Sequence, residues 1–195
     1  MPAATVPPGQ DRFVTAMQSS QLLLSQWEAG ELSEEVLADR VAALVVDRDG
    51  ARGFFVVAMT AEIPLLDRLP DSLLLVLRQA GEPVVDLTVR NLVMSTAMAL
   101  HHQRSEDEEQ RQGSLRVQGR ACELLRQLDA HAVLRRLEPM LAAARLEASA
   151  STQAEGLEQL PLAMQADLAM FDRWGYDPAQ RAAIAQALEG VAEPV

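Results

Sequence analysis

The stretch that most constrains the fold of this chain runs from Glu82 to Arg104 and is apolar on nearly all sides. Its apolar residues recur at steps of three and four, which is the spacing of an α-helix. One side carries Val85, Val89, Leu92 and Ala99, and the other carries Val84, Leu87, Met94 and Met98. A helix that is apolar all round is typical of the middle of a bundle. The sequence therefore predicts a central buried helix near residues 83–104.

This helix is not predicted to span a membrane. Asp86, Arg90 and Asn91 lie inside it, and each charge near a bilayer centre would cost about 2.5–3.5 kcal/mol. Asn91, Ser95 and Thr96 need hydrogen-bond partners if they are buried. We expect them to bond to helix backbones or to line a wet seam between helices. The alternative is that they form a small polar pocket.

The rest of the chain shows similar helical stripes, so we predict an all-α fold, a largely antiparallel bundle of seven to nine helices. Residues 53–61 are ambiguous, because Phe54-Phe-Val-Val57 also has the composition of a strand. A lone hairpin is only marginally stable, and no third strand candidate follows. We therefore favour a short buried helix for this segment.

Several residues predict where helices begin and end. The pair Ser105 and Glu108 matches a capping box, so a helix is expected to restart there. Gly113 and Pro139 are expected to interrupt or kink the helices that contain them. The segment Trp174-Gly-Tyr-Asp-Pro178 predicts a turn, with Gly175 ending one helix, Asp177 capping the next and Pro178 at its first position.

Composition divides the chain into three parts. Residues 1–10 contain two consecutive prolines and are expected to form a flexible tail. Residues 11–148 are expected to form the helical bundle. The Ala/Ser-rich segment Glu147–Gln153 resembles a linker, which predicts a C-terminal appendage over residues 149–195. The opposing interpretation is that the apolar residues of this appendage complete the main core.

The charge and cysteine content narrow the classes of function. The formal net charge is −11, which disfavours binding to nucleic acid or to anionic membranes and favours either solubility or a basic protein partner. The single cysteine, Cys122, has no partner for an intrachain disulfide. The N-terminal residues MPAATVPPGQ have no signal-peptide pattern. We therefore expect a cytoplasmic protein.

No residue pattern predicts catalysis, a cofactor or a metal. His102 and Glu106 are four residues apart and could share a helix face, with Glu109 one turn further on. Two or three such ligands could hold a divalent metal, and an enzyme would use His101, His102 and Glu106. The Glu-x-x-His motif of di-iron bundles is absent. Cys122 is expected to be a buried inert thiol, with redox sensing or chromophore attachment as alternatives. A metal-dependent enzyme remains only an alternative prediction.

The segment NLVMSTAMALHHQR, Asn91 to Arg104, resembles a helix of an uncharacterised cyanobacterial family of helical proteins. This resemblance implies no activity and no site residue. The function expected from the sequence is that of a non-catalytic interaction or assembly factor for a protein partner, with a homo-oligomer also possible. The predicted partner surface consists of Trp174, Tyr176, Ile184 and Leu188. The alternative is a small-molecule or pigment-binding module that uses the pocket around Asn91, Ser95 and Thr96.

Overall fold

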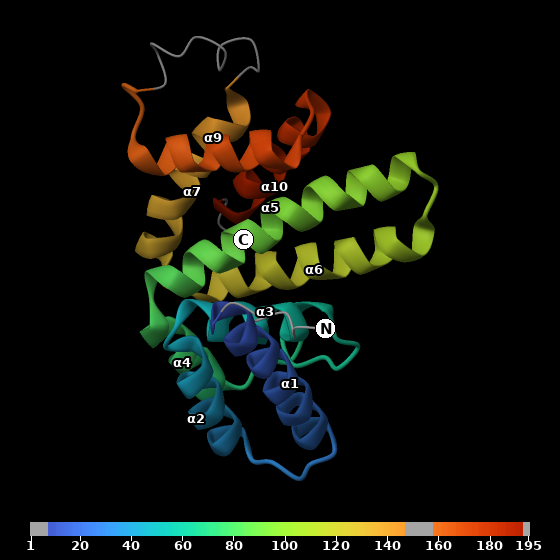
Figure 1. Ribbon diagram of the computed structural model, residues 1–195, viewed down its shortest axis with the longest axis vertical. Coiled ribbons are helices and arrows are strands. Elements are labelled where there is room, and N and C mark those ends of the chain that lie inside the picture. The colour runs from blue at the N-terminus through green and yellow to red at the C-terminus, as the bar shows by residue number, and fades with distance from the viewer. Residues whose placement is uncertain (1–7, 147–157, 193–195) are drawn as a thin grey trace, which may run out of the picture. The chain divides into compact units, whose positions relative to one another are not determined.

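The computed structural model describes residues 8–146 and 158–192, and within these ranges every regular element is an α-helix (Figure 1). The predicted all-α fold is therefore confirmed. In chain order the helices are α1 (Pro8–Glu28), α2 (Glu34–Val45), α3 (Arg48–Thr60), α4 (Asp71–Ala80), α5 (Glu82–Arg104), α6 (Glu108–Gln127), α7 (Ala130–Arg145), α9 (Leu162–Trp174) and α10 (Pro178–Ala192).

The helices form two compact units, residues 1–87 and residues 88–195. The boundary between the units lies within α5, which is continuous across it. Residues 158–192 belong to the same unit as α6 and α7. The predicted linker, Glu147–Gln153, lies outside the described residues.

In the first unit α1 packs along α3, and α2 packs against both α3 and α4. Gly53 lets α1 and α3 approach closely. A Cβ atom at Gly53 would lie 2.6 Å from the Cβ of Ala16 and 2.8 Å from the carbonyl oxygen of Phe13. The core beside this contact holds Phe54 and Phe55, whose rings meet edge to face with centroids 5.5 Å apart.

The ambiguous segment 53–61 is helical, as favoured, because α3 covers it almost entirely. Asp47 caps this helix by accepting a hydrogen bond from the backbone N–H of Gly50 at 2.8 Å. The sequence Asp47-Arg-Asp-Gly50 therefore starts a helix and does not form a hairpin turn. Burial of apolar side chains on several sides of α3 explains its strand-like composition.

Helix α5 has the predicted position, and its burial confirms a central core helix. Val85, Val89, Leu92 and Val93 are at most 2% exposed. The preceding helix ends at Gly81, whose φ of 68° lies in the left-handed region that favours glycine. Glu82 and Pro83 then occupy the first turn, where a missing proline N–H removes no helical bond.

The helices after α5 begin and continue differently from the prediction. Asp107, not Ser105, caps α6 by accepting a hydrogen bond from the N–H of Gln110 at 3.1 Å. Helix α6 then runs through Gly113, and α7 runs through Pro139. Neither residue ends its helix, because packing along the helix offsets the local cost of an interior glycine or proline.

The turn between α9 and α10 is confirmed in detail. Gly175 has a φ of 65° and ends α9. The side chain of Asp177 accepts a hydrogen bond from the N–H of Gln180 at 2.9 Å, and the N–H of Asp177 donates to the Gln180 side chain at 3.0 Å. This reciprocal pair is a capping box with glutamine as its second member. It rigidifies the corner at which the chain reverses.

Candidate partner-binding surface

Three polar contacts fix the register of α9 and α10 along α5, from Arg90 to its end. The guanidinium of Arg90 donates to the sulfur of Met170 at 3.2 Å. Arg104 forms an ion pair with Asp177, and the side chain of Gln180 donates to the carbonyl oxygen of Ala97 at 3.0 Å. The chain from Met170 to Asp177 therefore runs beside α5 from Arg90 towards Arg104.

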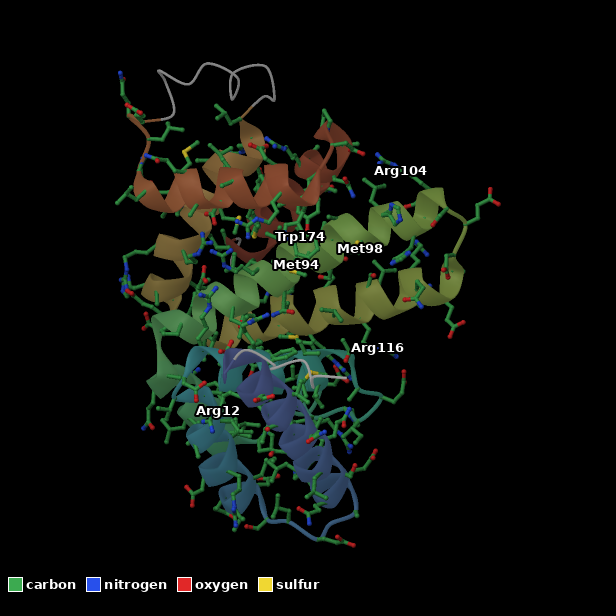
Figure 2. All side chains as sticks on the ribbon, in the orientation of Figure 1. Arg12, Met94, Met98, Arg104, Arg116 and Trp174 are labelled. Atoms are coloured by element: carbon green, nitrogen blue, oxygen red, sulfur yellow. The ribbon has the colours of Figure 1, made fainter. Side chains whose placement is uncertain are left out.

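Trp174 lies midway along this path and is therefore level with Met94 and Met98 of α5. Figure 2 labels Trp174, Met94 and Met98 near one another in its view. Trp174 is 54% exposed and Met98 is 37% exposed, and Met94 is half-buried. We name these three residues the tryptophan–methionine surface.

A buried ion pair holds α9 against α7. Asp167 has a side chain that is 1% exposed. Its carboxylate accepts hydrogen bonds from both terminal nitrogens of Arg136 on α7, at 2.7 and 2.6 Å. Arg90 adds a third charged group, 3.9 Å from the same carboxylate. A buried carboxylate requires such partners, because an unpaired charge is costly to desolvate.

No pattern in the sequence predicts this cluster. The only local signal is an aspartate inside the apolar pattern of α9. Its two arginine partners are separated from it by 31 and 77 positions in the chain, so the sequence gives no indication of the pairing.

Only one of the four residues predicted to form a partner surface is exposed. Tyr176 is 8% exposed, Leu188 is 1% exposed and Ile184 is fully buried. Ile184 and Leu188 lie in α10, which packs against α7. Tyr176 packs on Phe171 with ring centroids 5.8 Å apart, and burial raises the pKa of its hydroxyl to about 12. Trp174 alone of the four is available to a partner.

The polar residues considered for a pocket mostly bond within their own helix. Ser95 and Thr96 are buried, and both hydroxyls donate to the carbonyl oxygen of Leu92, at 3.1 and 2.8 Å. Asn91 is half-buried and also has an interaction partner. The hydroxyl groups are therefore satisfied by backbone, which was the favoured interpretation.

The residues considered for metal binding do not converge. Helix α5 ends at Arg104, and Glu106 has a φ of 57°, so Glu106 does not continue the helix face of His102. The rings of His101 and His102 meet edge to face, with centroids 5.4 Å apart. Within the described residues no three potential ligands lie close enough together to hold a metal ion.

Cys122 does not resemble an activated nucleophile. Its side chain is half-buried, and burial raises the pKa of its thiol, although Arg126 acts in the opposite direction. A raised pKa reduces the thiolate fraction at neutral pH, and the thiolate is the reactive form.

An acidic, exposed turn follows the tryptophan–methionine surface along α5. Glu106, Asp107, Glu108 and Glu109 are all exposed. A hydrogen bond from Gln112 and the neighbouring Arg111 lower the pKa of Glu108. Glu106 and Glu109 form no ion pair with any residue that the structure describes. Their charges are therefore not neutralised locally.

A second feature of this unit is a shallow pocket of about 350 Å³ between α7 and α10. Apolar groups of Ala144, Leu146 and Pro178 line it together with Arg181. Arg181 is 6% exposed and bonds to Asp172 at 2.8 Å and to the carbonyl oxygen of Tyr176 at 3.3 Å. Its remaining terminal nitrogen, Nη1, is buried without a hydrogen-bond partner.

Within residues 8–146 and 158–192, no helix is both long enough and apolar enough to cross a bilayer. No curated protein and no solved structure matches the chain. One family model, described as Uncharacterised conserved protein UCP020893, matches residues 12–191. Because this match covers nearly the whole chain, the protein belongs to this uncharacterised conserved family.

Proposed function

We propose that this protein is a non-catalytic interaction factor that docks a protein partner on the tryptophan–methionine surface. The observation that carries the proposal is the exposure of Trp174 at the end of α9 and of Met98 at the same level of α5, with the Trp174 segment held by the Arg104–Asp177 and Arg136–Asp167 ion pairs. Large aromatic side chains on a rigid support are frequent anchors of protein interfaces. Methionine side chains adapt to the shape of an apolar partner.

The chemistry of the other candidate groups supports a non-catalytic role. The histidines do not converge with a third ligand among the described residues, and burial suppresses the reactivity of Cys122. The acidic composition and single cysteine support a cytoplasmic location. The resemblance of Asn91–Arg104 to cyanobacterial proteins supports a bacterial setting.

The test is site-specific photo-crosslinking in the native host. A photoreactive residue is placed at position 174 or 98, and a matched control is placed at Leu134. Leu134 lies on α7 of the same unit and is 51% exposed, close to the exposure of Trp174. We expect one protein to be crosslinked from positions 174 and 98 but not from position 134. Equal crosslinking from all three positions would contradict the proposal.

A small-molecule-binding module is the second candidate function. The pocket between α7 and α10 favours it, because the unpaired nitrogen of the pocket-lining residue Arg181 could serve an acceptor group on a ligand. Native mass spectrometry and an absorbance spectrum of protein purified from its host test this candidate. Arg145 also lines this pocket. A bound molecule that is lost in Arg145→Ala would support the candidate, and a spectrum and mass of protein alone would count against it.

A further inference from the structure

We propose that the partner segment is a basic amphipathic helix that lies along α5, with its apolar face on the tryptophan–methionine surface and its basic residues on the acidic turn Glu106–Glu109. This inference rests on the proposed function and adds the chemistry of the partner. It combines an apolar contact area with a charged area at a defined position beside it.

The two areas are close enough for one helix to contact both. Met98 and Arg104 are six residues apart on α5, which is about 9 Å along the helix axis. The acidic turn begins immediately after Arg104. A partner helix of four to five turns is about 22–27 Å long. It therefore spans the tryptophan–methionine surface and the acidic turn together.

The charges select a basic partner. Arg104 is already neutralised by Asp177, and Arg111 is paired with Glu108. Glu106, Asp107 and Glu109 remain as exposed negative charges without ion pairs among the described residues. The whole chain carries a formal net charge of −11, so an acidic partner would be repelled at long range as well as at the contact.

The apolar area is suited to a helical segment. An amphipathic helix binds by placing apolar residues from successive turns on an apolar strip. Met94 and Met98 are one turn apart on α5, and Met98 is exposed. The Arg90–Met170 and Arg104–Asp177 contacts place the exposed Trp174 of α9 at the same level along α5. Flexible methionines accept different apolar side chains without strain.

The experiment uses the full chain with Trp27→Phe, so that Trp174 is the only tryptophan and reports on its own surroundings. The probes are two 18-residue helical peptides that share an apolar leucine face. One carries arginine on its polar face and the other carries glutamate. We expect only the arginine peptide to shift the Trp174 emission to shorter wavelength, with an affinity that falls as salt is added.

Charge variants then test the position of the acidic contact. Glu106→Gln with Glu109→Gln is compared with Glu138→Gln and Glu158→Gln, two exposed acids of the same unit on α7 and before α9. Both double variants change the net charge equally. We expect the first to weaken the arginine peptide about two- to tenfold, as expected for exposed charge pairs, and the second to leave it nearly unchanged.

Three outcomes would overturn the inference: equal weakening by both double variants, equal binding of the glutamate peptide, or no shift with either peptide. None of these outcomes depends on the native partner. If position 174 still crosslinks that partner in the host, the docking function stands and only the assignment of a basic helix fails. If position 174 crosslinks no partner while the arginine peptide binds as expected, the docking function itself fails.

Discussion

Arg136 on α7 donates two hydrogen bonds to the carboxylate of Asp167 on α9, from Nη1 to Oδ2 at 2.7 Å and from Nη2 to Oδ1 at 2.6 Å. The aspartate side chain is 1% exposed and the arginine side chain is 15% exposed. The planar guanidinium matches both carboxylate oxygens at once, a geometry that lysine does not provide. This pair joins α7, which precedes residues 147–157 in the chain, to α9, which follows them.

The first prediction concerns the energy of this pair. Asp167→Ala should lower the free energy of unfolding by about 3–5 kcal/mol, because it leaves the partly buried Arg136 without its carboxylate. The double variant Asp167→Leu with Arg136→Met removes both charges and should lose less stability than the single variant. Denaturant unfolding of the single and double variants measures the difference. A double variant less stable than Asp167→Ala would contradict the explanation.

The second prediction concerns the close approach of α1 and α3. Gly53→Ala places a methyl group 2.6 Å from the Cβ of Ala16. The overpacking should cost about 1–3 kcal/mol, more than the gain of about 1 kcal/mol in helix propensity. Gly119→Ala is the matched control, because Gly119 lies inside α6 with open space around it.

We expect thermal unfolding to show a lower Tm for Gly53→Ala and an equal or higher Tm for Gly119→Ala. If both substitutions raise the Tm by a similar amount, α1 and α3 do not pack as closely as described.

The third prediction concerns the C-terminal helices. Sequence composition suggested a separable appendage, but the contacts of α9 and α10 favour the opposing interpretation. A chain that ends at Ala150 would leave Arg136 without Asp167 and would uncover the faces of α7 that α9 and α10 contact. We expect such a chain to bind a hydrophobic dye and to unfold without a cooperative transition. A cooperative transition with no dye binding would restore the appendage interpretation.

The fourth prediction concerns acid. Hydrogen bonds from Arg104 and from the N–H of Gln180 lower the pKa of Asp177. Because the folded state has the lower pKa, the charged form contributes stability above about pH 4. This contribution is lost as the pH falls through the folded pKa. Asp177→Asn should therefore lose less stability than the wild type on acidification from about pH 4 to pH 2.

Thermal unfolding as a function of pH measures this effect. Asparagine is also a favourable helix cap, so the substitution removes the charge and retains a capping side chain. Arg104→Gln should reduce the acid dependence in the same direction, because it removes the largest cause of the lowered pKa. An unchanged pH profile in both variants would show that this ion pair does not form in solution.

Local signals in the sequence were sufficient for the positions of several elements. The periodicity after Glu82 predicted a helix near residues 83–104, within one residue of the observed start of α5. Gly175, Asp177 and Pro178 predicted the turn before α10. Helical periodicity and capping act between residues at most a few positions apart. They can therefore be read without knowledge of the tertiary contacts.

The sequence by itself determined an all-α protein, its central helix and the acidic charge. Tertiary structure decided which apolar residues became core and which remained at the surface. Tyr176, Ile184 and Leu188 are buried and Trp174 is exposed, although all four have the apolar character of partner contacts. Likewise, Asp167 finds Arg136 only because α7 and α9 pack together. The physical reason is that burial and ion pairing depend on contacts between distant segments, whereas helix formation depends mainly on neighbours in the chain.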